Sequence, residues 1–147
     1  MTIAEAKQAF IRTLIENDHL YASFEERNEH TINITFHGEN LKDINVSVTC
    51  IEAGDDAIVA SVTCYDLFNF EDKYSAGLIA CNKANEDNMM VKFYIDEDND
   101  VVVKTTLLFN GYGVDAEFNP GVVFTLALQV MLSVEDEYPN FAKAKFN

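Results

Sequence analysis

The strongest constraint on the fold is the alternation of apolar and polar residues along three stretches between residues 30 and 65. In "HTINITF" the two faces are fully separated, with Ile32, Ile34 and Phe36 against Thr31, Asn33 and Thr35. "INVSVTCIE" (Ile44–Glu52) and "AIVASVTCY" (Ala57–Tyr65) alternate in the same way. Because successive side chains of a strand point to opposite faces, each stretch is predicted to be a strand with one buried face. Such strands are typical of an antiparallel sheet.

Three helices are predicted around these strands. Thr2 can cap the first, which should end near Asn17 and bury Ile3, Ala6, Phe10 and Leu14. Asn69 or Asp72 is expected to cap the second, with an apolar stripe of Tyr74, Leu78, Cys81 and Ala84. Asn119 should cap the last helix, with Pro120 in its first position. Pro139 is expected to prevent that helix from running unbroken to the end.

The remaining strands complete the fold prediction. "LYASFEER" (Leu20–Arg27) is a weak strand, and Met89–Ile95 and Val101–Phe109 form a hairpin. The order α-β-β-β-β-α-β-β-α predicts an α+β fold, an antiparallel sheet with helices packed mainly on one side. Residues 1–147 contain no repeat or linker, so we expect a single domain.

The acidic stretch "FYIDEDNDVVV" (Phe93–Val103) poses the choice between a calcium loop and a hairpin turn. Asp96, Asp98 and Asp100 occupy the first three ligand positions of an EF-hand loop. Val101 stands where that loop needs glycine, and Leu107 stands where it needs a bidentate glutamate. The flanking residues also read as strands, so we expect a hairpin turn and no metal site.

No motif predicts catalysis or a cofactor. The glycines of "GYGVDA" (Gly111–Ala116) lack a helix starting within the turn, and we interpret Asn110–Phe118 as a loop. The three histidines have no metal-binding spacing, and Cys50, Cys64 and Cys81 lie on apolar stripes that predict buried, reduced thiols. We therefore expect a protein that is not an enzyme and has no catalytic, cofactor-binding or metal residues.

Charge limits the partners. Ten basic and 25 acidic residues give a net charge of −15, which disfavours binding to nucleic acid or to anionic membrane surfaces. "MTIAEAKQAF" does not resemble a signal peptide, and the most apolar stretch is too short to span a bilayer. The odd number of cysteines without a CxxC pair also favours a reducing compartment, so we expect a cytoplasmic protein.

The last helix suggests an interface. In "GVVFTLALQVMLSV" the polar residues form one narrow stripe of Thr125, Gln129 and Ser133, and the opposite side is apolar enough to cover a sheet. Leu126 flanks the stripe on one side, and Leu128 and Leu132 flank it on the other. These leucines need cover from a wide groove in the core or from a second subunit. Full burial of each leucine would stabilise either arrangement, so the residues alone leave both open.

The stretch "CNKANEDNMMVKFYIDEDNDVVVKTTLLF" (Cys81–Phe109) resembles the YbjN-like family of bacterial sensory transduction regulators. The resemblance is clearest from Glu71 to Val134. It implies a fold similar to type III secretion chaperones, which are small acidic dimers that bind partner polypeptides. The resemblance therefore favours a homodimer through the last helix, either through Leu128 and Leu132 or through Leu126 across the narrow polar stripe. It carries no catalytic residues. We therefore expect a non-catalytic protein-binding or regulatory module; the alternative is a small-molecule sensor or an enzyme with a pocket near Asn110–Phe118.

Overall fold

The computed structural model describes residues 1–54 and 56–146. Its elements follow the predicted order: α1 (Ile3–Glu16), β1 (Ser23–Glu26), β2 (Thr31–Phe36), β3 (Ile44–Glu52), β4 (Ile58–Asn69), α2 (Tyr74–Asp87), β5 (Lys92–Ile95), β6 (Asp100–Phe109) and α3 (Pro120–Phe146). A short 3-10 turn at Asp18–Leu20 follows α1. The α+β class predicted from the sequence is thus confirmed.

The sheet has six antiparallel strands in the order β1-β2-β3-β4-β6-β5. The strands β4 and β5 run parallel with β6 between them, and α2 connects them in a split β-α-β unit. In the β3–β4 hairpin the pairing runs from Glu52 opposite Ile58 to Ser47 opposite Thr63. Part of the expected turn, Asp55, lies outside the described residues.

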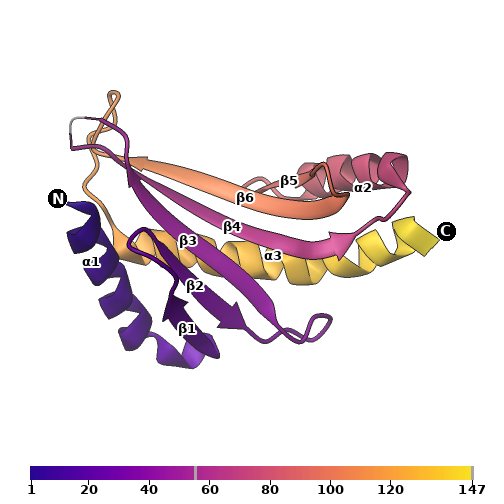
Figure 1. Ribbon diagram of the computed structural model, residues 1–147, viewed down its shortest axis with the longest axis horizontal. Coiled ribbons are helices and arrows are strands. Elements are labelled where there is room, and N and C mark those ends of the chain that lie inside the picture. Colours follow the sequence, from indigo (N-terminus) through magenta and orange to yellow (C-terminus); the bar gives the residue numbers. More distant parts are fainter. Residues whose placement is uncertain (55, 147) are drawn as a thin grey trace.

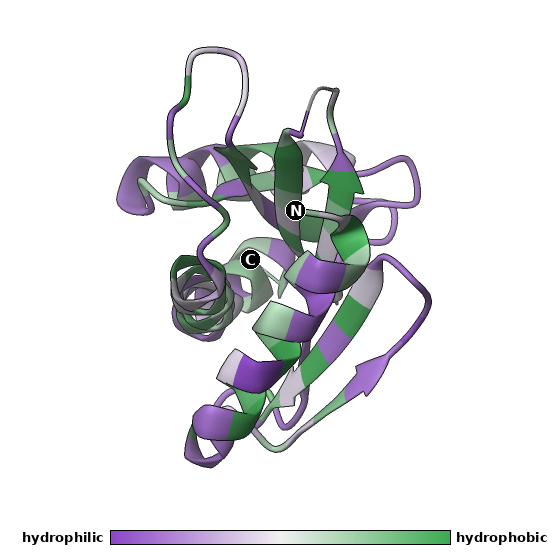
Figure 2. Ribbon diagram, turned by 90° about the vertical axis from the view of Figure 1, so that its left-hand side faces the viewer, coloured by the Kyte–Doolittle hydropathy of each residue, from purple (hydrophilic) through white to green (hydrophobic). Residues whose placement is uncertain are grey.

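All three helices cover the same face of the sheet (Figure 1). The 27-residue α3 runs the length of the molecule, with α1 against its first part and α2 against its second. Between helices and sheet lies one core whose largest fully buried side chains are Phe10, Phe36, Phe70, Phe93 and Phe141. The alternation that predicted the strands is visible as hydrophilic and hydrophobic bands along the ribbons in Figure 2. None of the described helices carries an apolar stretch long enough to span a bilayer.

The first helix forms as predicted. The Thr2 hydroxyl accepts a hydrogen bond from Glu5 N, and Glu5 Oε1 accepts one from Thr2 N, which makes a capping box. Asn17 is the C-cap, and the buried residues are those of the predicted face. The last helix also begins as predicted, because Asn119 Oδ1 accepts a hydrogen bond from Val122 N at 3.2 Å.

The second helix corrects the prediction in two respects. Lys73 is its N-cap and no side chain caps it, whereas Asn69 belongs to β4. Its buried residues are Gly77, Cys81 and Ala84, while Tyr74 and Leu78 are 47% and 41% exposed. The helix lies so close to β5 that a Cβ atom on Gly77 would collide with the Ile95 side chain. Small residues therefore form the contact face, which turns the larger side chains toward solvent.

The expectation that Pro139 interrupts the last helix is wrong, because α3 continues through it to Phe146. Proline lacks the N–H that would bond the carbonyl oxygen of Glu135, four residues earlier. Nδ2 of Asn40, in the β2–β3 loop, donates to that oxygen at 3.0 Å instead. The Glu135 carboxylate in turn accepts hydrogen bonds from the backbone N–H groups of Asn40 and Leu41. The loop therefore replaces the missing helical hydrogen bond and fixes itself to α3.

The fourth strand is longer than predicted and contains an irregularity. It extends to Asn69, and its pairing with β6 shifts register between Cys64 and Phe68. On its other side the ladder with β3 ends at Ser47 and Thr63, although β3 itself begins at Ile44. The sheet is therefore opened locally beside the first residues of β3. Bulges of this kind are often found next to functional sites.

Candidate functional site

The acidic stretch forms the predicted hairpin turn between β5 and β6. Asp96 N donates to Asp100 O at 2.9 Å, and Asn99 N donates to Asp96 O at 3.1 Å. One carboxylate oxygen of Asp96 accepts the backbone N–H groups of Asp98 and Asp100. Asn99 has φ 63°, so it occupies the left-handed position that glycine often takes in such turns. The turn is thus held by its own backbone.

The three aspartates do come together. Carboxylate oxygens of Asp96, Asp98 and Asp100 lie within 4.8 Å of one another. The EF-hand pattern fails where the sequence indicated, since Val101 is buried and Leu107 offers no oxygen ligand. Part of the ligand set is also engaged by the turn and by Asn69, whose Nδ2 donates to Asp100 Oδ1 at 2.8 Å. The cluster therefore has a structural use in the turn, and it does not match the ligand pattern of an EF-hand loop.

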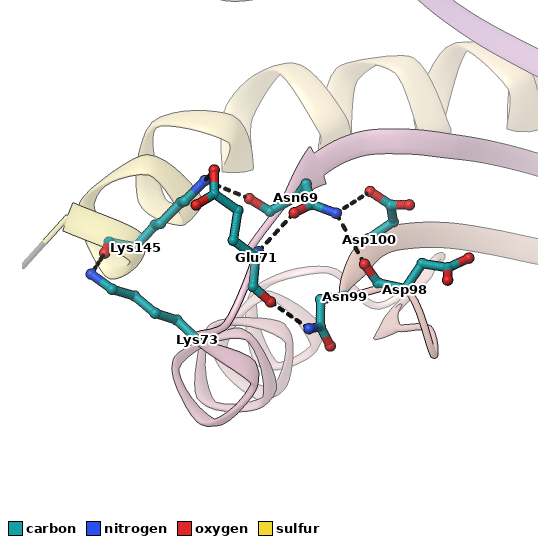
Figure 3. Close-up of polar contacts among 7 residues, drawn as sticks. All are labelled: Asn69, Glu71, Lys73, Asp98, Asn99, Asp100 and Lys145. Atoms are coloured by element: carbon teal, nitrogen blue, oxygen red, sulfur yellow. Dashed lines mark hydrogen bonds and ion pairs between the residues drawn. The ribbon is translucent and has the colours of Figure 1, made fainter.

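The same turn is fastened to the end of β4 (Figure 3). Asn69 Nδ2 also donates to Asp98 O at 3.1 Å, and Asn69 Oδ1 accepts from Glu71 N at 2.7 Å. The Glu71 carbonyl accepts a hydrogen bond from the Asn99 side chain. Glu71 has φ 54°, which these contacts on both sides of its backbone hold in place. Asn69, expected to cap α2, thus joins β4 to the hairpin turn instead.

Lys145 adds the end of α3 to this junction. Its ammonium lies 2.9 Å from Glu71 Oε1 and donates to Asn69 O, also at 2.9 Å. The ammonium also lies 5.6 Å from the centre of the Phe68 ring, and the Lys145 side chain is only 13% exposed. Lys73 donates to the Lys145 carbonyl (Figure 3). These hydrogen bonds and this ion pair connect the acidic turn, β4 and the end of α3, so we interpret the polar cluster as structural.

The cysteines lie where the sequence placed them, in the core. Cys50, Cys64 and Cys81 are each 3% exposed and none is in a disulfide. Burial away from water raises the pKa of Cys50 and of Cys81 to about 11. A nucleophilic cysteine needs a lowered pKa, so these two thiols are unsuited to that chemistry at neutral pH.

The Asn110–Phe118 loop contains a tight turn at Gly111–Val114, where Tyr112 and Gly113 both have positive φ. The Tyr112 hydroxyl donates to Ala53 O at 2.8 Å, which ties the loop to the β3–β4 hairpin. A cavity of about 250 Å³ lies beside the loop, lined by Met1, Asp56, Ile58, Phe109, Asn110, Glu117 and Phe118. The alternative prediction from the sequence was a small-molecule site near Asn110–Phe118, and this cavity lies at that place.

The three leucines predicted to form an interface differ in exposure. Leu126 is 5% exposed and belongs to the chain's own core, so this leucine is covered without a second subunit. Leu128 is half-buried against the core, and Leu132 is 48% exposed. The prediction assumed that α3 meets only a sheet, whereas α1 and α2 also pack against it. The surface that remains is Leu132 with the outer part of Leu128.

A larger exposed surface lies over β5, β6 and the α2–β5 connection, at the edge of the sheet that β5 forms. An open hollow of about 760 Å³, which we call the Met groove, is lined by Met89, Met90, Val91, Lys92, Tyr94, Lys104, Thr105 and Thr106. Met89 is 96% exposed, Met90 58% and Tyr94 37%. Flexible, polarisable methionine side chains are frequent on surfaces that adapt to polypeptide partners.

Two lysines form the charged part of the Met groove. Lys92 on β5 and Lys104 on β6 are direct cross-strand neighbours, and both are exposed. Like charges in this position destabilise a sheet. Among the side chains that the structure describes, which do not include those of Asp55, Asp66 and Asn147, neither lysine has an ion-pair partner, although acidic residues exceed basic ones by 25 to 10. An anionic group bound between them would relieve their repulsion.

Comparison with family models gives a match over residues 11–131, to the family YbjN, described as "putative bacterial sensory transduction regulator". The match covers most of the chain. The chain belongs to the YbjN family. No curated protein matches it.

The YbjN match includes the acidic turn and the whole Met groove, whereas Leu132 lies one residue beyond its end. Sequence reasoning missed the groove because it placed Met89 and Met90 inside a strand, where alternation would have buried one of them. The strand begins only at Lys92. Two adjacent methionines directly after a helix were the available signal, since both cannot face the core in an extended segment.

Proposed function

We propose that this YbjN-family chain is a non-catalytic regulatory module that acts in the cytoplasm and binds a partner polypeptide in the Met groove. The observation that carries the proposal is the exposure of Met89 and Met90 beside two exposed lysines that face each other across β5 and β6. Contiguous apolar surface of this kind marks interaction sites on soluble proteins. The resemblance of the family to chaperones that bind polypeptides supports the same class of function.

The chemistry of the groove specifies the partner. Met89, Met90 and Tyr94 offer apolar contact, and the facing Lys92 and Lys104 offer two positive charges in the same groove. A segment with apolar side chains next to aspartate or glutamate would satisfy both parts. The long-range field of a chain with net charge −15 opposes acidic partners, so the local lysine pair has to supply the specificity.

The partner is expected to engage by side chains and not by adding a strand. Although β5 is an edge strand, the side-chain amide of Asn85 donates to Phe93 O at 3.0 Å and accepts from Phe93 N at 2.6 Å. The outward backbone groups of Phe93 are therefore occupied by α2. A peptide cannot pair with them without displacing Asn85.

Photo-crosslinking in cells tests the proposal. A crosslinking residue at position 89 should capture a defined partner, and one at position 79, which is also well exposed and lies on α2, should not. A synthetic acidic and apolar segment from that partner should then bind the purified chain. Replacing both Met89 and Met90 by serine, or both lysines by glutamate, should weaken binding about tenfold or more. Equal capture from positions 79 and 89, or binding unchanged in both double variants, would refute the assignment.

The homodimer remains a proposal and involves two leucines of α3 instead of three. Leu132 and the exposed part of Leu128 would meet a second copy, since full burial of a leucine contributes about 1.5–3 kcal/mol. The Met groove lies on β5, β6 and the α2–β5 connection, away from these side chains along the sequence and on other elements. Partner binding and self-association are thus separable by mutation.

A further inference from the structure

The opening in the sheet beside β3 leads into a cavity of about 350 Å³, distinct from the Met groove. It arises where the β3–β4 ladder has ended and β4 bulges away from β6. Because no strand pairing closes this point, Val134 of α3, on the opposite side of the sheet, contributes to the lining. The cavity thus connects the open face of the sheet with the edge of the core.

One end of this cavity is apolar. Leu41 of the β2–β3 loop, Ile44, Leu67 of the bulge and Val134 line it. Ile44 is 2% exposed and Leu67 6%, so these side chains are fixed by the core. The Leu41 N–H is bonded to the Glu135 carboxylate, which holds the loop in place against α3. An apolar body of a few carbon atoms would find a preformed surface here.

The polar part of the lining holds several hydrogen-bond donors and also the Asp43 carboxylate, which lies 3.0 Å from His37 Nδ1. Asn33 is 5% exposed; its Nδ2 donates to Asn45 Oδ1 at 3.3 Å, and its Oδ1 accepts from Ser47 Oγ at 3.4 Å. Asn45 Oδ1 also accepts from Thr35, so the Asn45 amide N–H groups stay available to a ligand. Arg27 completes this polar part, with its Nε 2.9 Å from Glu25 and its side chain 55% exposed. Since a guanidinium has five N–H donors, the pair with Glu25 leaves several for a ligand.

We propose that this cavity binds a small carboxylic acid with an apolar body. Its carboxylate lies between Arg27 and Asn45, and its body lies against the half-buried Leu41 and the small exposed part of Leu67. A guanidinium with neighbouring amide donors matches the two oxygens of a carboxylate. If the chain is a regulatory module, as proposed above, this ligand would bind it at a site separate from the Met groove.

Titration of the full chain with 4-methylpentanoate, followed by ¹H–¹⁵N NMR, tests the proposal. Saturable shifts are expected at Asn33, Asn45 and Ser47, with Kd of about 1 mM or lower. The neutral analogue 4-methylpentan-1-ol should bind at least about tenfold more weakly, because it lacks the charge that Arg27 recognises.

Two arginine variants complete the experiment. Arg27→Gln should weaken binding of the acid at least about tenfold, whereas Arg12→Gln, on the exposed side of α1, should leave it unchanged. Both arginines are on the surface, so both variants should fold. The proposal is overturned by an absence of saturable shifts, by shifts centred elsewhere, by equal binding of the alcohol, or by equal effects of the two variants.

Discussion

Replacing Asn85 by alanine should destabilise the protein more than most substitutions on the surface of a helix do. The half-buried Asn85 amide makes two hydrogen bonds to the backbone of Phe93, at 2.6 and 3.0 Å. Phe93 is 1% exposed, so in the variant its N–H and C=O groups would have limited access to water. Each hydrogen bond contributes about 0.5–1.5 kcal/mol, and a buried group left without a partner costs about 1–3 kcal/mol. Alanine regains about 0.5 kcal/mol of helix propensity. We expect a net loss of roughly 2–3 kcal/mol in the free energy of unfolding.

Urea denaturation followed by circular dichroism measures this loss. The matched control is Asn82→Ala, because Asn82 is an exposed asparagine on the same helix and should show no loss or a small gain. Asn85→Asp provides a second comparison, since it keeps an acceptor for Phe93 N but cannot donate to Phe93 O. It should also be destabilised. If Asn85→Ala and Asn82→Ala unfold at the same urea concentration, the amide does not stabilise β5 and the reasoning fails.

Four further predictions follow from other contacts. Asn40→Ala should cost about 1 kcal/mol in the wild type but less in a Pro139→Ala background, where residue 139 regains its N–H; a double-mutant cycle with zero coupling would contradict this. Cys50 and Cys81 should react slowly with thiol reagents in the native protein and promptly in denaturant, and rapid native labelling would refute their burial. Because their pKa is raised in the folded state, the thiols of the unfolded chain ionise first, so the free energy of unfolding should fall as the pH rises from 9.0 toward 11. Calorimetry at physiological salt should detect only weak calcium binding to the acidic turn, and micromolar affinity of fixed stoichiometry would overturn that. Sedimentation should show a dimer at micromolar concentration that Leu132→Asp converts to a folded monomer; a monomeric wild type would exclude the α3 interface.

The strands and the first helix could be predicted because their signals are local. The apolar face of "HTINITF" and the Thr2 cap each depend on residues a few positions apart, and both are present in the structure, although Asn33 on the other face of β2 is buried as well. The hairpin at Asp96–Asp100 was predictable for the same reason, since the missing glycine and glutamate argue against an EF-hand within one short stretch.

The errors come from contacts that are distant in sequence. Pro139 does not end α3 because Asn40, 95 residues away from the Glu135 carbonyl, supplies the donor that proline lacks. The face of α2 could not be chosen correctly from hydropathy, because close approach to Ile95 selects the small Gly77 over Leu78. The burial of Leu126 likewise depends on how other elements pack around α3. Hydropathy describes each helix alone, whereas its neighbours decide which side is covered.

The candidate sites were the least predictable part. The cavity beside β3 requires a bulge in β4, and "VTCYDLF" contains no glycine or proline that would indicate a bulge. The lysine pair of the Met groove depends on the β5–β6 register, which places Lys92 opposite Lys104. The register can be derived only after both strand boundaries are known, and the first boundary was three residues away from its expected position at Met89.

The position of α3 in the chain has a consequence for biosynthesis. All six strands precede α3, yet this helix covers the sheet and packs on both α1 and α2. At about 5–20 residues per second, a ribosome needs roughly 1–5 s to add its 27 residues. During that interval the apolar face of the emerging sheet has no complete cover. The nascent chain is therefore open to aggregation or to binding by cellular chaperones until its final helix leaves the exit tunnel and docks.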